Sequence, residues 1–430
     1  MNYLDEVVRL QKSGEARGIT SVCSAHPLVL EASLRHGLAA AAHVPVLIEA
    51  TCNQVNQFGG YTGLRPADFV RFVVEIADKT GFPRQNLILG GDHLGPLVWS
   101  NEPAISAMGK AREMVREYVQ AGFGKIHLDC SMPCADEQTL TVEVIAQRCA
   151  ELASVAEMTA VECHSSPRYV IGSEVPAAGG AKAGEDQLVI TDPLNAATTI
   201  ALTQRAFSAM GLDSAWERVI ATVVQPGVEF GDESIHEYDP SAAAGLARFI
   251  ETVPGLIYEA HSTDYQSRSA LHALVADHFG ILKVGPGLTF AFRQAVFALE
   301  KIEKTLLDAD QTSHISDRLE AAMLKNPAYW QKHYAGTPEK QKFARFYSFS
   351  DRIRYYWTDP DVHSAFTHLM KNLTAQPIPF ALISENLPRQ VEKIRSQEIK
   401  NQPRELLFGQ VMDVLDDYRF GCNQPCGNQF

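Results

Sequence analysis

Short runs of apolar residues, each ending in polar or glycine residues, recur along the first two thirds of the chain. Runs this short and rich in Val, Ile and Leu are typical of strands that are covered on both faces, as in parallel sheets. The predicted strands are Ile19–Cys23, Val44–Ile48, Asn86–Leu89, Lys125–Leu128, Tyr169–Ile171, Val219–Val224, Leu256–Tyr258 and Ile281–Val284.

Segments with helical periodicity lie between these runs. In Pro66–Lys79, for example, Phe69, Phe72, Val73 and Ile76 fall on one stripe of a helix. Strands that alternate with helices predict an α/β fold, and eight such units favour a closed (β/α)8 TIM barrel over a doubly wound open sheet. The remaining predicted helices are Ala107–Gln120, Thr139–Met158, Pro193–Ala209, Ser241–Glu251 and Ser267–His278.

The alternation stops near Leu288. A single helix is predicted for Thr289–Leu307, and the chain then stays charged, aromatic and helical as far as Tyr418. We therefore expect two parts: a barrel over residues 1–304, and a C-terminal helical extension over residues 305–430 that packs on the barrel.

Composition narrows the class of protein. The net charge of −13 and the lack of a basic run argue against a nucleic-acid partner or an anionic membrane surface. No apolar stretch approaches the roughly 18 residues of a membrane span, and the charged segment Met1–Arg9 is no secretory signal. Eight cysteines are too few for a disulfide scaffold and indicate a reducing, cytoplasmic location. A zinc site from the pairs Cys130/Cys134 and Cys422/Cys426 is a weaker alternative to buried or incidental thiols.

Polar residues follow the predicted strands. The residues just after each strand of a barrel face one mouth, so these side chains are expected to converge. Histidines and carboxylates around one mouth can bind a divalent metal and leave a position open for substrate. The residues at the strand ends are Asp92, His93, Asp129, Glu174, Gln225 and His261, together with Glu49 and Asn53.

The histidines differ in their setting. Asp92 and His93 follow a Gly-Gly pair that permits close backbone approach, and His261 stands beside a cluster of polar residues, which favours a metal site. His26 and His127 are instead expected to be satisfied structural residues, since His127 lies inside an apolar strand.

A phosphate site is expected at the last strand end. No P-loop motif is present, and no G-x-G-x-x-G lies between a strand and a helix, which argues against a kinase. Gly285, Pro286 and Gly287 precede a helix whose first amides, with the Thr289 hydroxyl, are suited to an anion. Ser262 is placed to help. The alternative is that Gly-Pro-Gly only makes the turn.

Long motifs in the chain resemble a known family, the non-catalytic subunits of tagatose-bisphosphate aldolase. The motifs are SVCSAHPLVLEA, IEATCNQVNQFGGYTG, LGGDHLGP, KIHLDCSM, VIGSEVP, VVQPGVEF, YEAHSTDYQ, LKVGPGLTFAFRQA and SDRIRYYW. The resemblance runs over nearly the whole chain and implies kinship with class II fructose- and tagatose-bisphosphate aldolases, which are zinc-dependent (β/α)8 barrels.

The resemblance also implies roles. Asp92 matches the catalytic acid/base, His93 and His261 match two metal-ligand histidines, and Glu174 stands in the place of a third ligand and is a second catalytic candidate. An oxygen ligand makes the site harder, so Mn²⁺ or Mg²⁺ is expected to bind as well as Zn²⁺. The expected substrate-binding residues are Asn53, Gln54, Asp129, Gln225, Ser262, Lys283, Gly285, Thr289 and Arg354.

Two functions are implied by the family. One is a metal-dependent epimerase that converts D-tagatose 6-phosphate into D-fructose 6-phosphate by retro-aldol and aldol chemistry in galactitol and tagatose catabolism. The alternative is a subunit required for the activity and stability of a catalytic class II aldolase chain. The expected partners are a phosphorylated ketose, that aldolase chain and a second copy of this chain. Arg352–Trp357 is expected either to cover the site, with Arg352 or Arg354 on the phosphate, or only to pack by its aromatic rings.

Overall fold

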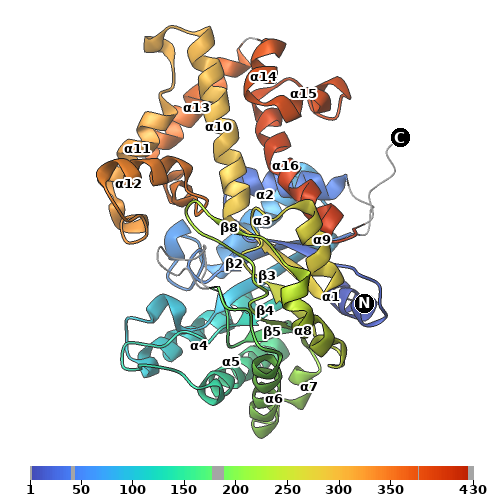
Figure 1. The fold of residues 1–430 in the computed structure, drawn as a ribbon. Coiled ribbons are helices and arrows are strands. Elements are labelled where there is room, and N and C mark those ends of the chain that lie inside the picture. Colours follow the sequence, from blue (N-terminus) through green and yellow to red (C-terminus); the bar gives the residue numbers. More distant parts are fainter. Residues whose placement is uncertain (1, 40–43, 177–187, 376, 425–430) are drawn as a thin grey trace.

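The protein is described here by a computed structural model that covers residues 2–39, 44–176, 188–375 and 377–424. Within these ranges, eight parallel strands close into a barrel, and each pairs with its neighbours around the ring (Figure 1). The predicted (β/α)8 barrel is confirmed. The strands, in order around the ring, are β1 (Ile19–Val22), β2 (Val46–Thr51), β3 (Leu87–Leu94), β4 (Lys125–Leu128), β5 (Arg168–Gly172), β6 (Val219–Val223), β9 (Ile257–Ala260) and β10 (Phe279–Val284).

Helices surround the barrel because each has one apolar stripe to bury. On α3 the stripe predicted from the sequence is buried at Phe69, Val73 and Ile76, and Gly81 ends the helix with a positive φ of 77°. The helices around the barrel are α1 (Tyr3–Lys12), α2 (Pro27–Leu38), α3 (Pro66–Thr80), α4 (Ala104–Gln120), α5 (Val142–Glu162), α6 (Pro193–Ala209), α7 (Asp213–Trp216), α8 (Pro240–Glu251) and α9 (Arg268–Ala276).

The amino-terminal end of the barrel is apolar. Leu4 and Val7 of α1 pack in one buried cluster with Ile19, Leu47 and Ile281 of the strands. Helix α1 therefore closes the bottom of the barrel with hydrocarbon, and the polar chemistry is confined to the other end.

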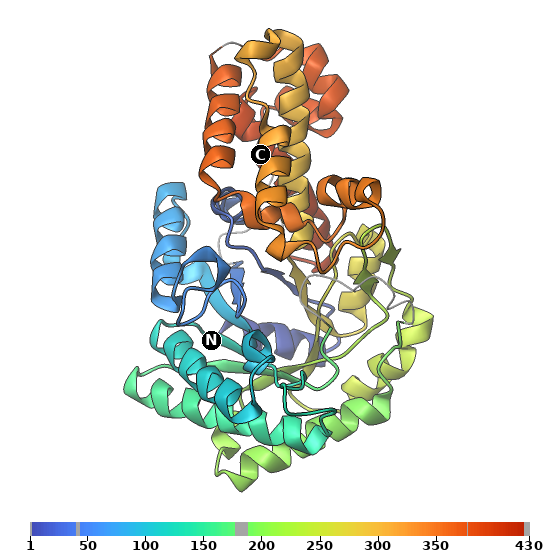
Figure 2. The same cartoon turned by 90° about the vertical axis from the view of Figure 1, so that its left-hand side faces the viewer.

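The C-terminal part forms a lobe of helices beside the barrel, drawn in orange and red in Figures 1 and 2. Helix α10 (Pro286–Leu306) leads into the lobe, and α16 (Pro403–Gly421) returns to pack against α2, α9 and α10. The amide of Gly18 donates to the Cys422 carbonyl at 2.9 Å, which ties the end of α16 to the start of β1. The other helices of the lobe are α11 (Ile315–Lys325), α12 (Pro338–Tyr347), α13 (Pro360–Thr374), α14 (Phe380–Asn386) and α15 (Pro388–Arg395).

Element boundaries differ from prediction at a few places. Strand β3 runs on through Asp92 and His93, which were expected to follow it. The pattern also missed α1, α2 and a small hairpin of β7 (Glu229–Phe230) and β8 (Ile235–His236). No helix within the described ranges has both the length and the hydropathy needed to cross a bilayer.

Candidate functional site

The barrel interior holds a buried layer of opposite charges. Lys125 Nζ lies 2.7 Å from Glu49 Oε1 and 2.7 Å from Glu259 Oε2, and all three side chains are inaccessible to solvent. Lys283 Nζ lies 2.7 Å from the other Glu49 oxygen and 2.7 Å from Asp92 Oδ1. Burial alone lowers the pKa of Lys283, but Asp92 and Glu49 outweigh it and raise the pKa well above its ordinary value. Lys283 is therefore a fixed cation beside Asp92.

A bulge in β3 brings Asp92 and His93 to the same site. Successive side chains of a regular strand point to opposite faces. Here the register between β3 and β4 shifts between Gly91 and Leu94, and His93 has a positive φ of 50°. Such a bulge re-aims side chains and is a typical feature next to functional sites. Just before it, glycine is required at position 90, because a Cβ there would lie 2.8 Å from Glu49 Cγ.

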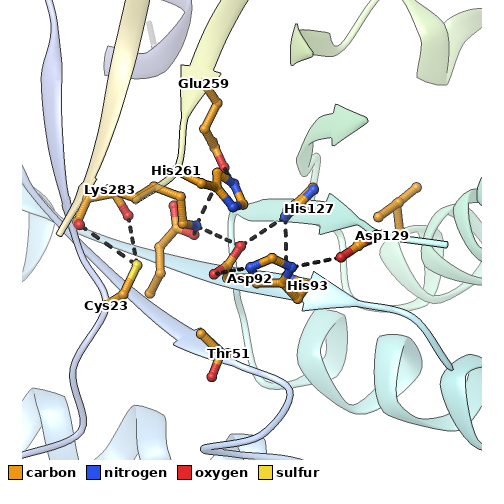
Figure 3. Close-up of polar contacts among 12 residues, drawn as sticks. Cys23, Thr51, Asp92, His93, His127, Asp129, Glu259, His261 and Lys283 are labelled. Atoms are coloured by element: carbon orange, nitrogen blue, oxygen red, sulfur yellow. Dashed lines mark hydrogen bonds and ion pairs between the residues drawn. The ribbon is translucent and has the colours of Figure 1, made fainter. Parts of the chain in front are cut away.

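Three imidazoles gather around Asp92 (Figure 3). The ring centroids of His93, His127 and His261 lie 4.9 to 5.3 Å apart. Each ring has one nitrogen on a carboxylate: His93 Nδ1 on Asp129 at 2.7 Å, His127 Nδ1 on Asp92 at 2.9 Å, and His261 Nε2 on Glu259 at 3.0 Å. Because an ionised carboxylate only accepts, we assign the ring proton to that nitrogen in His93 and His261. His127 Nδ1 also accepts from the backbone N–H of His93 at 3.2 Å, so no tautomer is assigned to this ring. The second nitrogen of the His261 ring keeps its lone pair.

Charge in the cluster favours an ionised Asp92. Burial raises the pKa of Asp92, but His93 and Lys283 outweigh it and hold that pKa well below the ordinary value. Burial lowers the pKa of His93, yet Asp92 reverses the effect and raises it. Burial lowers the pKa of His261 to about 3, so this ring is neutral. The centre thus combines an anion, a cation and a neutral imidazole in one water-poor space.

The residues present fit a divalent metal. Ligand atoms of Asp92, His127, Glu259 and His261 all lie within 4.8 Å of one another. His127 Nε2 is buried and has no hydrogen-bond partner among the described residues. The centre has two more carboxylates than ammonium groups, and a divalent cation would balance that excess of negative charge. The carboxylates are those of Glu49, Asp92, Asp129 and Glu259, and the ammonium groups are those of Lys125 and Lys283. Histidines oriented by carboxylates are typical of metal ligands.

A cavity of about 700 Å³ opens above this centre. Asp92, His93, His261 and Lys283 form its polar floor. Segments outside the barrel strands contribute walls, among them Arg354, Tyr355 and Trp357, and helix α13. Most of the predicted site residues line this cavity, namely Asn53, Gln54, Asp92, His93, His261, Ser262, Lys283, Gly285, Thr289 and Arg354.

Three predicted residues lie outside the cavity lining. Asp129 is buried and orients His93. Gln225 closes its own turn, because its side-chain oxygen accepts from the amides of Gly227 and Val228 at 2.8 and 3.0 Å. Glu174 is exposed and belongs to no metal-capable group found among the described residues. Its carboxylate accepts from Thr191 and Asn195 at 2.6 and 2.8 Å, so the structure does not bring it to the imidazoles.

The sequence interpretation missed three members of the centre. His127, expected to be structural, belongs to the metal-capable group, and Lys125 and Glu259 were not considered. The sequence did contain a signal for them, a two-residue spacing of polar residues. It separates Lys125 from His127 in β4, and Glu259 from His261 around the end of β9. Residues at that spacing share one face of a strand. Two polar residues on one face of an otherwise apolar strand indicate a polar barrel interior.

The predicted phosphate position at α10 is occupied by a carboxylate. Asp264 Oδ1 accepts from the amides of Gly285 and Gly287 at 2.9 and 2.7 Å. Thr289 donates its hydroxyl to the Pro286 carbonyl at 3.1 Å. The first amides of this helix are thus already paired within the chain.

The aromatic segment of the extension forms part of the cavity wall. Arg354 lines the cavity, donates to the Tyr355 hydroxyl at 2.8 Å, and forms no ion pair with a carboxylate in the described ranges. Arg352 lies elsewhere and donates to the Tyr329 carbonyl at 2.9 Å. Tyr329 and Tyr355 stack at 4.8 Å. The segment therefore both packs by its rings and presents one guanidinium to the cavity.

The alternative cysteine site gains no support. Cys130 and Cys134 are buried free thiols, and neither belongs to a metal-capable group among the described residues. Cys422 lies at the end of α16 as a free thiol, and Cys426 lies outside the described residues.

The fold and the site together define a (β/α)8-barrel protein with a histidine–carboxylate centre under a cavity at the carboxyl ends of its strands. Residues 4–423 match the family described as D-tagatose-1,6-bisphosphate aldolase subunit GatZ/KbaZ-like. The chain belongs to this family, as its motifs predicted, and is therefore an aldolase-related protein.

Three solved structures are similar to the chain to different degrees. A crystal structure described as a probable tagatose 6 phosphate kinase from Sinorhizobium meliloti 1021 is 46% identical, with a TM-score of 0.87, and the match covers 94% of this chain and 100% of that one. Fructose-bisphosphate aldolase (Fba) from Campylobacter jejuni is 15% identical over 90% of this chain and 94% of that one, with a TM-score of 0.43. The YdjI aldolase from Escherichia coli K12 is 11% identical over 87% and 98%, with a TM-score of 0.39.

Proposed function

We propose that this protein is a ketohexose-phosphate 4-epimerase that converts D-tagatose 6-phosphate into D-fructose 6-phosphate in tagatose and galactitol catabolism. One observation carries the proposal: an ionised Asp92 lines the cavity, with Lys283 and the imidazoles packed against it. Burying several charges is costly unless they are paired. A centre of this kind at the floor of a cavity is more readily explained by catalysis than by support of another chain.

The chemistry begins at the C4 hydroxyl. Asp92 accepts its proton as the C3–C4 bond breaks, and the bonding electrons move to the C2 oxygen. This gives a three-carbon enediolate and glyceraldehyde 3-phosphate. The Lys283 ammonium, held beside Asp92, stabilises the negative charge on the enediolate. If the aldehyde then turns its other face to C3, the bond re-forms with C4 inverted, and Asp92 returns the proton.

A divalent metal fits the same centre. The residues that would hold it are His127, His261 and Glu259, with Asp92 in the same group of ligand atoms. The His93 ring packs against those of His127 and His261. When bound, Zn²⁺, Mn²⁺ or Mg²⁺ supplies a Lewis acid for the C2 carbonyl. Asp129 fixes the orientation of the His93 ring, and Glu259 fixes that of the His261 ring.

The aldehyde must stay in the cavity between the two halves of the reaction. Arg354 is the cation suited to the C6 phosphate, because it lines the cavity and has no carboxylate partner at ion-pair distance in the described part of the chain. Tyr355 and Trp357 of the same segment line the cavity too, so this wall limits the entry of water and the escape of the aldehyde.

The alternative function is a supporting subunit. The description of the family names an aldolase subunit, which favours a role in the activity and stability of a separate catalytic class II aldolase chain. In that case the same surface would act by binding the partner, and isolated protein would turn over no substrate.

An assay of the purified chain tests the proposal. D-Tagatose 6-phosphate is supplied with Zn²⁺ or Mn²⁺ and without ATP, and D-fructose 6-phosphate is followed enzymatically. We expect product from the chain alone, and loss of product after chelation. No product in any metal, combined with stabilisation of a co-expressed class II aldolase, would establish the subunit function instead. ATP-dependent loss of D-tagatose 6-phosphate with formation of ADP and no D-fructose 6-phosphate would mark a phosphoryl transfer to the sugar instead.

Zn²⁺ affinity is expected to depend on His127 and not on Glu174, and two matched variants test this. His127→Gln is expected to weaken Zn²⁺ binding by about tenfold or more, because it removes a ring nitrogen from the centre. Glu174→Gln, made as its matched partner, is expected to leave the affinity within about twofold, since Glu174 lies apart from the imidazoles. Titration calorimetry measures both. The opposite ranking would restore Glu174 as the third ligand.

A further inference from the structure

The amino-terminal end of α10 opens onto the cavity. Gly285, Pro286 and Thr289 all line it. The first amides of a long helix carry a partial positive charge and are suited to a phosphate. In this chain the position is filled, because Asp264 Oδ1 accepts from both the Gly285 and Gly287 amides. Asp264 itself lines the cavity, so its carboxylate stands where an anionic ligand group would otherwise bind.

The loop that carries Asp264 is held on both sides. The Thr263 hydroxyl donates to the Lys283 carbonyl at 2.6 Å, and the Tyr265 hydroxyl donates to the Phe349 carbonyl at 2.5 Å. Ser262 and Tyr265 have positive φ values of 54° and 66°, a conformation that costs energy for these residue types. Asp264 is therefore fixed against the helix and cannot swing away freely to admit an anion.

The charge of Asp264 follows from its surroundings. Burial raises its pKa to about 6, while the two amides and Arg354 oppose that rise. Above that pH the group is a carboxylate. Within the same cavity, the Arg354 guanidinium thus attracts an anionic group and the Asp264 carboxylate repels one.

We propose that Asp264 is a specificity-determining residue that admits the uncharged hydroxyl end of a ketose and excludes a second phosphate. The inference rests on the proposed function, in which the C6 phosphate meets Arg354, and it adds that the C1 end of the sugar lies at Asp264. In D-tagatose 6-phosphate and D-fructose 6-phosphate the C1 end is a hydroxyl, which can donate to the carboxylate. In a ketose 1,6-bisphosphate the same end is a phosphate, which the carboxylate repels and displaces from the helix amides. The substrate class is therefore ketose monophosphates.

Binding measurements on the full chain test this, at a pH well above the pKa of Asp264. The probes are D-fructose 6-phosphate, D-fructose 1,6-bisphosphate and inorganic phosphate, titrated by calorimetry. The wild-type protein is expected to bind the monophosphate about tenfold or more tightly than the bisphosphate. Asp264→Ser removes the carboxylate and frees the two amides, so the preference should shrink by about tenfold or reverse. Asp264→Asn keeps the hydrogen bonds without the charge and should fall between the two.

The control is Asp239→Ser, at the exposed N-cap of α8, where serine caps as well as aspartate. It should leave the preference unchanged. Circular dichroism and retained monophosphate binding establish that each variant is folded. Equal binding of both sugars by the wild type, or an unchanged preference in a folded Asp264→Ser, would overturn the inference. If neither sugar binds the wild type, the proposed function fails, and inorganic phosphate then decides the role of Asp264: it should bind Asp264→Ser more tightly than the wild type.

Discussion

Asp92→Asn is expected to lower kcat for D-tagatose 6-phosphate by about 10²- to 10⁴-fold. The amide keeps the shape of the side chain but cannot accept the C4 hydroxyl proton at the pH of the reaction. It also removes the anion that lies 2.7 Å from Lys283 and 2.9 Å from His127. Steady-state rates measure the loss. KM should change much less than kcat, because the proton moves only as the C3–C4 bond breaks.

A matched control separates chemistry from folding. Asp239→Asn makes the same substitution at the exposed N-cap of α8, where asparagine is as good a cap as aspartate. Its kcat should equal that of the wild type. If Asp92→Asn is folded, binds D-fructose 6-phosphate and still turns over at the wild-type rate, Asp92 is not the base.

The barrel was predictable because it depends on local patterns. Strands covered on both faces must be apolar, and the helices between them must carry one apolar stripe, so both are visible in the order of residues. The C-terminal lobe was visible as the loss of that alternation. Helix α1 was not, because its apolar residues close the bottom of the barrel, and that contact depends on the finished fold.

The site was predictable only in part. Asp92, His93 and His261 stand at strand ends, where the barrel brings side chains together, and the structure places all three on the cavity floor. Glu174 ends a strand as well, but its loop turns the carboxylate to Thr191 and Asn195. No pattern in the sequence reports the direction in which a loop turns.

His127 was misread for a related physical reason. A polar residue inside an apolar run is usually a satisfied structural residue, and only the barrel shows that its face of β4 points to the interior. The bulge that turns Asp92 and His93 the same way is likewise a product of strand pairing. The carboxylate of Asp264 fills the anion position that Gly-Pro-Gly suggested, and that contact joins two separate loops. Contacts of this kind follow from the fold, which the local sequence does not encode.

The largest expected effect on stability is that of Lys125→Met. Lys125 is fully buried between Glu49 and Glu259, 2.7 Å from each. Removing the ammonium leaves one oxygen of each buried carboxylate unpaired, with the Lys283 ammonium remaining beside Glu49. Breaking a buried ion pair in this way costs about 3–5 kcal/mol in comparable cases. We expect a clear fall in the urea midpoint, followed by far-UV circular dichroism. Metal binding should weaken too, because Glu259 orients His261 and loses its own partner.

Two further variants show whether charge is the cause. Lys125→Met combined with Glu49→Gln removes one of the excess buried anions and should recover part of the lost stability, since the penalty lies in uncompensated charge more than in the missing pair. Lys110→Met breaks the ion pair with Glu102 on the partly exposed surface and should change stability by no more than about 1 kcal/mol. A Lys125→Met protein as stable as the Lys110→Met protein would mean that Glu49 and Glu259 take up protons or water when Lys125 is removed. The buried ion pairs would then not be what holds the floor of the cavity in place.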